Sequence, residues 1–218
     1  MHTGWNFPGT CLISVSLLPV PAVVLGMTSI AIFASGAGSN ARKIIDYFAG
    51  HPHIKIGLVV CNRPGAGVLE IARQAGIPTL LIEKEKFFRA NGYVDELKEY
   101  GIGFIVLAGF LWKIPSTLIA AFKNRIINIH PALLPKYGGK GMYGNFVHES
   151  VIVNKELESG ISIHYVDEVY DHGKVIFQAR CKVDSQDTAE TLAQKIHMLE
   201  HANYPTVIEK VIDLQNHR

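Results

Sequence analysis

Two side chains that can handle protons and oxyanions, Asn128 and His130, lie two residues apart after a short apolar run at residues 125–127. If that run is a buried strand, both side chains point to one side, because alternate residues of a strand share a face. Pro131 lacks a backbone N–H and ends the strand. An amide donates to a developing oxyanion, and an imidazole donates to it or shuttles protons near neutral pH. The pair therefore indicates catalysis at a strand exit; the alternative is a surface histidine beside a structural asparagine.

A third partner is needed to set the protonation state of His130. Asp167, Glu168 and Asp171 are the candidates, all within the stretch 167–174. Asp171 precedes a histidine and a glycine, so its turn is tight and can hold the carboxylate in place. We expect Asp171 to lie near His130, to raise the pKa of the imidazole and to favour its donor form. The alternative is a solvated acidic turn between two strands.

A glycine-rich loop at residues 36–40 follows an apolar strand and opens a helix. The backbone N–H groups of Gly38, Ser39 and Asn40 would bind an anion such as a phosphate at the helix start. The alternative is a tight turn with Ser39 as the helix N-cap. The loop also fits the dinucleotide-binding pattern G-x-G-x-x-A, but the second strand ends without the acidic residue that holds a ribose. Since Arg63 at that point could meet a 2′-phosphate, a nicotinamide enzyme remains an alternative.

Strands and helices must alternate to position these residues. We expect strands at residues 28–34, 54–61, 79–82, 104–108 and 126–129, separated by helices at 40–48, 68–74, 93–100 and 115–122. This alternation predicts an α/β fold with a mostly parallel central sheet and helices on both faces. A glycine-dense loop at 138–144 is followed by a helix at 147–158, strands at 161–166 and 175–183, and a helix at 188–213. Pro205 should bend or divide that last helix.

The composition is that of a globular protein. The chain has 218 residues, of which 48% are hydrophobic and 18% charged, with a net charge of +2. These values favour one domain and give no sign of nucleic-acid or membrane binding.

The cysteines, Cys11, Cys61 and Cys181, are far apart and lack metal-ligand spacing. They fit small apolar residues in a reducing compartment, so we expect a cytoplasmic protein without a metal.

Residues 1–26 differ from the rest of the chain. The stretch 11–25 is apolar, but no Lys or Arg precedes it, Pro19 and Pro21 interrupt it, and no clear cleavage motif follows. It is also too short and broken to span a bilayer. We therefore expect residues 1–26 to be an extension that is disordered or results from a misassigned start, and residues 27–218 to be the domain. A weak export or anchor segment is the alternative.

Taken together, the motifs resemble those of the phosphoribosylglycinamide formyltransferases, the folate-dependent family of purine synthesis, over residues 28–212. The string N-x-H-P-x-L-L-P marks the wider folate formyltransferase superfamily. The loop S-G-x-G-S-N and the helix sequence E-H-x-x-Y-P narrow the resemblance to this family. The matching pieces are residues 35–40, 61–63, 107–110, 128–131, 133–137, Asp171 and 200–205.

This resemblance implies a Rossmann-like formyltransferase fold and a reaction. A formyl group would pass from the co-substrate 10-formyltetrahydrofolate to the amine of glycinamide ribonucleotide, in de novo purine (IMP) biosynthesis, without a metal. The products would be formylglycinamide ribonucleotide and tetrahydrofolate, and the enzyme would be a monomer or homodimer. The implied catalytic set is Asn128, His130 and Asp171. Gly38, Ser39 and Asn40 would hold the 5′-phosphate of the ribonucleotide, and Glu200 its ribose hydroxyls.

The implied folate site lies after the fourth strand and against the loop 166–171. Its residues would be Arg89, Phe110, Leu111, Trp112, Lys113, Ile114 and Asn128. Trp112 and Lys113 depart from the family pattern of a basic and then an apolar residue, so Trp112 packs either on the pterin or over a helix start. The loop 138–144 also lacks the histidine expected there.

Three other functions share parts of this pattern. Methionyl-tRNA formyltransferase carries the same N-x-H-P string, with an added C-terminal domain and a basic surface. A formyltetrahydrofolate hydrolase would use the same three catalytic residues with water, and carries an N-terminal regulatory domain. A non-catalytic binding protein of this fold would not need the full catalytic set. The length, the charge and the presence of all three residues favour the ribonucleotide transferase.

Overall fold

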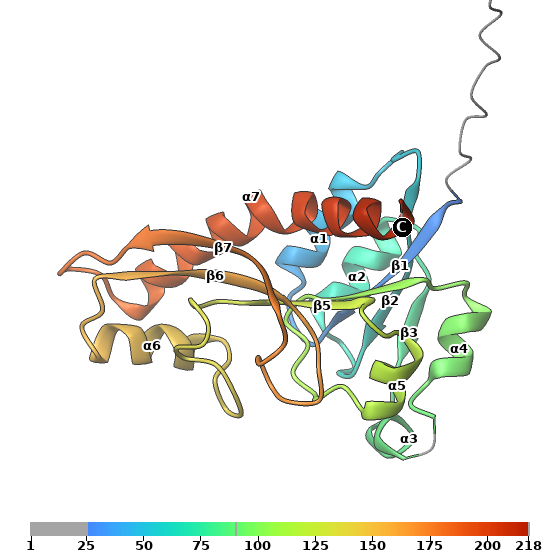
Figure 1. Ribbon diagram of the computed structural model, residues 1–218, viewed down its shortest axis with the longest axis horizontal. Helices are drawn as coiled ribbons and strands as arrows, with labels where there is room; N and C mark the ends of the chain where they lie inside the picture. Colours follow the sequence, from blue (N-terminus) through green and yellow to red (C-terminus); the bar gives the residue numbers. More distant parts are fainter. Residues whose placement is uncertain (1–25, 90, 218) are drawn as a thin grey trace, which may run out of the picture.

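The computed structural model describes residues 26–89 and 91–217. The expectations for residues 1–25 therefore lie outside the described part of the chain. The described residues form one seven-stranded sheet with the order β3-β2-β1-β4-β5-β6-β7 (Figure 1). The strands are β1 (Thr28–Ala34), β2 (Ile54–Cys61), β3 (Thr79–Leu81), β4 (Phe104–Leu107), β5 (Ile126–His130), β6 (Glu158–Tyr165) and β7 (Val175–Lys182). The pairings from β3 to β5 are parallel, and those of β6 with β5 and β7 are antiparallel.

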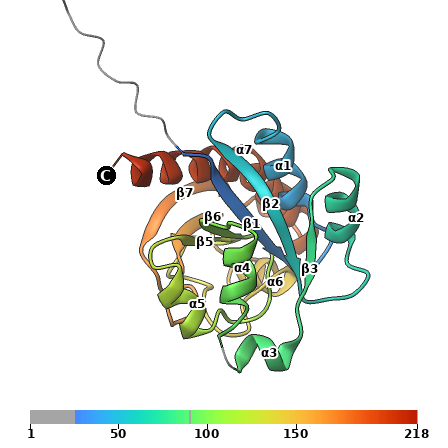
Figure 2. The same cartoon turned by 90° about the vertical axis from the view of Figure 1, so that its right-hand side faces the viewer.

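Helices cover both faces of this sheet, as the sequence predicts (Figure 2). They are α1 (Ser39–Tyr47), α2 (Gly67–Gln74), α3 (Lys84–Phe88), α4 (Val94–Glu99), α5 (Ser116–Ala121), α6 (Asn145–Val153) and α7 (Ala189–Asn216). Alternate residues of β1 enter two separate cores: Ile30 and Ile32 pack with α1, α2, α6 and α7, whereas Ala31 and Phe33 pack with α3, α4 and α5. The apolar run of β1 is explained by this burial on both faces.

The strand order reverses beside β1, which places the candidate residues at one edge. From β1 the chain winds outward through β2 and β3, then returns to add β4 and β5 on the other side of β1. In such sheets the loops after the strands on either side of the reversal leave a crevice at the carboxyl ends. The glycine loop after β1, the segment after β4 and the end of β5 all emerge there.

Helix α7 braces the strands that carry these segments. The side chain of Tyr204 is fully buried, and its hydroxyl donates a hydrogen bond to the Leu107 carbonyl oxygen at 2.8 Å. The same hydroxyl lies 3.4 Å from the Ile127 carbonyl oxygen. One tyrosine thus links the last residue of β4 to the residue before Asn128.

One helix prediction is wrong in its bounds. The helix expected at residues 147–158 begins at Asn145 and ends at Val153, because residues 158–160 join β6. Gly160 serves strand packing rather than a helix end, since a Cβ there would lie 2.0 Å from the Ala179 carbonyl oxygen. The sequence reading also missed the short helix α3.

Pro205 does not divide α7, which continues through it to Asn216. Two side chains that flank the proline bond carbonyl oxygens that precede it: Asn203 Nδ2 donates to the Leu199 oxygen at 2.7 Å, and Thr206 Oγ1 to the Asn203 oxygen at 2.9 Å. The helix continues although proline lacks the N–H that would bond the carbonyl of His201, and the proline ring is buried. Among the helices of the described residues, none has the length and apolar character required to cross a membrane.

Candidate active site

The predicted site residues meet around one cleft of about 610 Å³ at the carboxyl edge of the sheet. Its walls come from the loop after β1, the segment after β4, the end of β5, the glycine-dense loop before α6, the segment after β6 and one face of α7. The sequence-predicted residues that line it are Gly38, Ser39, Asn40, Phe110, Leu111, Trp112, Lys113, Ile114, Asn128, His130, Asp171 and Glu200. Residues far apart in the chain thus share one cavity.

Asp171 lies between the other two members of the predicted catalytic set. Its Oδ2 is 3.6 Å from His130 Nδ1, and its Oδ1 is 3.5 Å from Asn128 Nδ2. The backbone N–H of Gly139 donates to Oδ2 at 2.9 Å. Burial opposes ionisation of this carboxyl, but its contacts with His164, His130 and Gly139 prevail and lower its pKa. Asp171 is therefore a carboxylate at neutral pH.

His130 is buried, with 4% of its surface exposed, and both of its ring nitrogens face acceptors. Nε2 lies 2.7 Å from the Tyr137 carbonyl oxygen, which can only accept, so Nε2 carries a proton. Burial lowers the pKa of His130, while the Asp171 charge and the Tyr137 carbonyl raise it less strongly. Asp171 thus raises the pKa of His130 as expected, but desolvation of the imidazolium outweighs this carboxylate and the net shift is downward.

His164 is a member of this cluster that the sequence reading missed. Its Nδ1 lies 2.8 Å from the Tyr165 carbonyl oxygen, which can only accept, so Nδ1 bears a proton. Its Nε2 lies 3.1 Å from Asn128 Nδ2 and 3.6 Å from Asp171 Oδ1, so His164 contacts both of these residues. The antiparallel register pairs Asn128 directly with His164. A histidine within the apolar strand at 161–166 was the available signal, but its partner depends on a long-range register.

The glycine loop presents a helix start that has no side-chain cap. Gly38 is the N-cap of α1, with a φ of 83°, and α1 begins at Ser39. The alternative of Ser39 as N-cap is therefore wrong. A Cβ at Gly38 would lie 2.8 Å from Val68 Cβ, so glycine is required both for the backbone angle and for the packing against α2. The first N–H groups of α1 are left to meet an anion in the cleft.

Glu200 lies in the same end of the cleft and is not a solvated surface residue. Only 6% of its surface is exposed, and Asn40 Nδ2 donates to its Oε2 at 2.9 Å. Burial raises the pKa of Glu200, and the bond from Asn40 opposes that shift. His197, one helical turn earlier on α7, lines the cleft as well and was missed by the sequence reading. Its three-residue spacing from Glu200 was the signal that could have revealed it.

The segment after β4 forms an apolar wall opposite. The ring of Trp112 packs against Phe87, Phe88 and Phe110 at centroid distances of 5.7, 5.7 and 6.3 Å. Trp112 therefore packs against the last two residues of α3 and also lines the cleft, so its packing on the pterin stays a prediction. At the rim, Lys113 Nζ lies 5.9 Å from the centre of the Tyr170 ring.

Arg89 is not brought to this cleft. It follows α3, its side chain is 79% exposed, and its guanidinium pairs with Glu85 at 2.7 Å. Phe110 and Trp112 line the cleft on this side instead.

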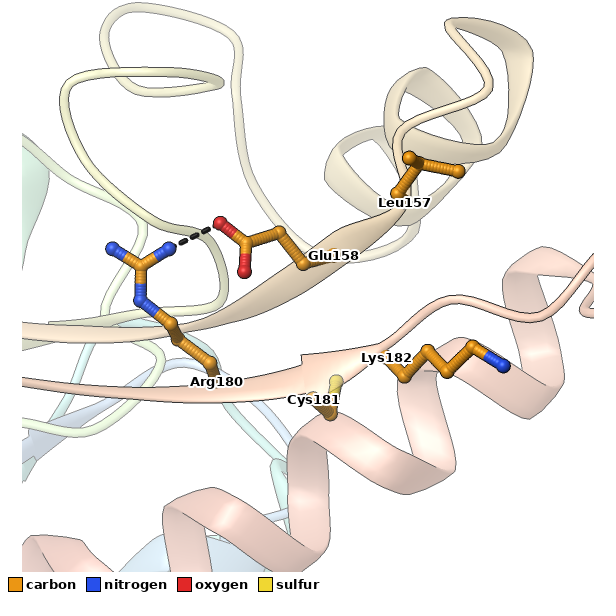
Figure 3. A pocket seen from close by; sticks show the side chains of 5 residues that line it. All are labelled: Leu157, Glu158, Arg180, Cys181 and Lys182. Carbon is orange, nitrogen blue, oxygen red and sulfur yellow. Dashed lines mark hydrogen bonds and ion pairs between the residues drawn. The ribbon is translucent and has the colours of Figure 1, made fainter.

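A second hollow of about 580 Å³ lies where β6 begins and β7 ends (Figure 3). It is lined by Leu157, Glu158, Arg180, Cys181 and Lys182, and its central polar groups, Arg180 and Glu158, pair with each other. It shares no residue with the cleft. Within residues 26–89 and 91–217, no group of three or more His, Cys, Asp or Glu side chains is arranged to hold a metal ion.

Comparison with known proteins supports this reading of the fold. The family model described as "Formyl transferase" matches residues 28–208. Among solved structures, phosphoribosylglycinamide formyltransferase from Bacillus halodurans aligns with a TM-score of 0.76 and 37% identity, over 85% of this chain and 95% of that one. Glycinamide ribonucleotide transformylase 1 from Symbiobacterium toebii aligns with a TM-score of 0.76 and 30% identity, over 84% and 86%. The chain belongs to the formyl transferase family.

Within that family it groups with proteins named phosphoribosylglycinamide formyltransferase. The Bacillus subtilis protein of that name is 36% identical over 195 residues, which cover 87% of this chain and 97% of the relative. The chloroplastic protein of Arabidopsis thaliana is 42% identical over 84% of this chain. The match spans 65% of the length of that plant relative and 63% of the one from Vigna unguiculata.

Proposed function

We propose that this protein transfers a formyl group from 10-formyltetrahydrofolate to the amine of glycinamide ribonucleotide, in purine biosynthesis. The observation that carries the proposal is the position of Asn128, His130 and Asp171 in the cleft, between an uncapped helix start and an apolar wall. A substrate with a phosphate at one end and a folate with a flat ring system suit these two ends. The names of the relatives agree with this assignment.

The ribonucleotide occupies the end formed by α1 and α7. The backbone N–H groups of Gly38, Ser39 and Asn40 hold its 5′-phosphate, which the helix dipole also favours. The carboxylate of Glu200 accepts hydrogen bonds from the ribose hydroxyls. His197, on the same face of α7, adds a donor close to the phosphate. This arrangement directs the amine of the glycinamide toward His130.

The folate lies along the apolar wall. Its ring packs against Phe110, Leu111 and Ile114, and the segment 166–171 covers the opposite side. Lys113, beside Tyr170 at the rim, provides a positive charge for the carboxylates of the folate tail. Trp112 supports this wall by holding it against α3. Arg89 contributes only if its pair with Glu85 opens.

The chemistry requires an oxyanion stabiliser and a route for protons. The substrate nitrogen attacks the formyl carbon, a C–N bond forms, and the bond to N10 of the folate breaks. Asn128 and protonated His130 donate to the oxyanion of the tetrahedral intermediate, and Asp171 stabilises the imidazolium. The attacking amine loses one proton and N10 gains one, with His130 and Asp171 as the relay, directly or through water. No covalent enzyme intermediate or metal is needed.

A formyltetrahydrofolate hydrolase would use the same catalytic residues but would not need a ribonucleotide. The uncapped start of α1 beside buried Glu200 favours the transferase, because water needs neither group. The test is the absorbance change of a 10-formylfolate donor, with and without glycinamide ribonucleotide. Formation of formylglycinamide ribonucleotide only with both substrates is the expected result. Donor loss at an equal rate without the ribonucleotide would replace the transferase with a hydrolase.

The proposal includes the compartment, the oligomeric state and the partners of the enzyme. We place it in the cytoplasm as a monomer or homodimer, with residues 27–218 as the active domain and no nucleic acid, membrane or metal as partner. The free thiols of Cys61 and Cys181 suit a reducing compartment. Light scattering of the purified protein will give its oligomeric state. Activity after exhaustive chelation tests the independence from metal.

A further inference from the structure

The side chain of His148 is a polar group in the cleft wall that the reaction described above does not use. His148 lies on α6, is 4% exposed and lines the same cleft as His130 and Glu200. Its Nδ1 is buried and has no hydrogen-bond partner among the described residues. Buried polar atoms are satisfied in the great majority of cases, so an orphan beside a substrate cleft needs an explanation.

We propose that His148 binds the carboxamide of the ribonucleotide substrate, donating a hydrogen bond from Nε2 to the carbonyl oxygen between the ribose and the reacting amine. The inference rests on the proposed function, since it names a part of that substrate. It assigns to α6 a direct role in recognition, in addition to the phosphate and ribose contacts made by α1 and α7.

The uncharged ring of His148 suits the carbonyl oxygen of the carboxamide, which is an uncharged acceptor. Burial, then the neighbouring His197 and His130, lower the pKa of His148 to about 4, so the ring is uncharged at neutral pH. A neutral imidazole has one N–H donor and one acceptor nitrogen. A charged ring here would repel the substrate amine in its ammonium form, which makes the neutral state the useful one.

The tautomer follows from what each ring nitrogen meets. Nδ1 is enclosed without a partner, and an orphaned buried N–H is rarer in proteins than an under-satisfied acceptor. The proton therefore belongs on Nε2. Of the two ring nitrogens, only Nδ1 is both buried and unpartnered, so Nε2 retains access to the cleft that the residue lines. His148 thus offers one N–H to the cavity.

The position of His148 selects the carboxamide among the substrate groups. The two residues that perturb it electrostatically are His130, at the reacting end, and His197, at the phosphate and ribose end. The phosphate has the start of α1, the ribose hydroxyls have Glu200, and the formyl oxygen has Asn128 and His130. The carboxamide oxygen, which lies between these ends of the substrate, is the remaining acceptor.

A matched set of substitutions separates the two ring nitrogens. His148→Gln places an amide N–H near the position of Nε2, His148→Asn places one near Nδ1, and His148→Leu removes both. We expect His148→Leu and His148→Asn to raise the KM for glycinamide ribonucleotide about 5- to 50-fold, the effect of one lost buried hydrogen bond. The KM for the folate should stay within about 2-fold, and His148→Gln should restore most of the ribonucleotide affinity.

Calorimetric binding supplies a readout that does not need turnover. Ribose 5-phosphate lacks the carboxamide, whereas formylglycinamide ribonucleotide contains it. His148→Leu should weaken binding of the second ligand and leave the first unchanged. Equal weakening of both, unchanged binding of both, or a Gln variant no better than Leu would each overturn the assignment. If no variant and no wild-type protein bound either ligand, the proposed function itself would fail, which is a distinct result.

Discussion

His130 is held by a backbone carbonyl: its Nε2 lies 2.7 Å from the oxygen of Tyr137. Tyr137 comes immediately before the glycine-dense loop 138–144, so the proposed catalytic imidazole is tied to the start of that loop. With Asp171 facing Nδ1, both nitrogens meet acceptors, a pattern that favours the imidazolium, whereas burial opposes it. Nε2 carries a single N–H, and the Tyr137 carbonyl already accepts from it, so the position of residue 137 bears on whether Nε2 can donate elsewhere.

Replacement of His130 by alanine tests its place in the chemistry. If the imidazole stabilises the oxyanion, His130→Ala should lower kcat by about 100-fold or more, because one oxyanion donor is typically worth that much. The KM values for both substrates should change little. Steady-state kinetics with both substrates measures this, and near-normal turnover would remove His130 from the catalytic set.

The charge of Asp171 should control the titration of His130. Asp171→Asn keeps the shape and deletes the charge, so the imidazolium loses a partner and the pKa of His130 should fall below its already lowered value. Activity that needs protonated His130 should then weaken most at the higher end of the pH range over which His130 titrates. Each unit of pKa corresponds to about 1.4 kcal/mol.

NMR titration of His130 in both proteins, together with pH–rate profiles, provides the measurement. Unchanged titration and unchanged turnover in Asp171→Asn would direct attention to Asp167 or Glu168.

Replacement of Gly38 should weaken binding of the phosphate-bearing substrate more than binding of the folate. Gly38→Val puts a side chain at a left-handed backbone position and against Val68, which displaces the start of α1. The KM for the ribonucleotide should rise far more than that for the folate, because the phosphate loses its backbone donors. A thermal melt of the variant distinguishes this from a general defect, and equal increases in both KM values would point to the latter.

The charge of Glu200 should lower the stability of the free protein while it contributes to binding of the ribonucleotide. Because its folded pKa is raised by burial, the folded state binds a proton more readily than the unfolded chain, and the stability from this group is lost as pH rises through the folded pKa. Glu200→Gln should therefore stabilise the free protein relative to wild type at neutral pH, and this advantage should shrink as the pH falls through the folded pKa and be absent below the unfolded pKa. It should also raise the KM for the ribonucleotide. Urea unfolding at two pH values, paired with kinetics, checks both halves; a destabilised variant at pH 7 would contradict this account.

Residues 1–26 should be dispensable for activity. The first strand begins at Thr28, and its pairing with β2 and β4 accounts for its place in the sheet. A chain that begins at Met27 should keep kcat, both KM values and a melting temperature close to those of the full chain. A large loss of activity or stability would show that the segment packs on the domain.

Local patterns in the sequence predicted most of the strands and the residues that sit on one element. Asn128 and His130 were identifiable because a strand places alternate side chains together, and Gly38 because a helix start needs a special turn. The contact of Asn128 with His164 could not be predicted, because it depends on the register between β5 and a strand more than thirty residues away. The bond from His130 to Tyr137 was also beyond prediction, since a backbone carbonyl has no signature in the side-chain sequence. The end of α6 was misjudged because Gly160, which resembles a helix stop, serves the close approach of β6 and β7.

The spacing between Glu200 and Tyr204 gives α7 a constraint that composition does not reveal. Four residues is close to one helical turn, so the carboxylate in the cleft and the hydroxyl that bonds the Leu107 carbonyl lie on one side of the same helix. A single residue inserted between them would rotate one relative to the other by about 100°. Helix α7 should therefore accept changes of side chain on its outer surface far more readily than any change of length between Glu200 and Tyr204.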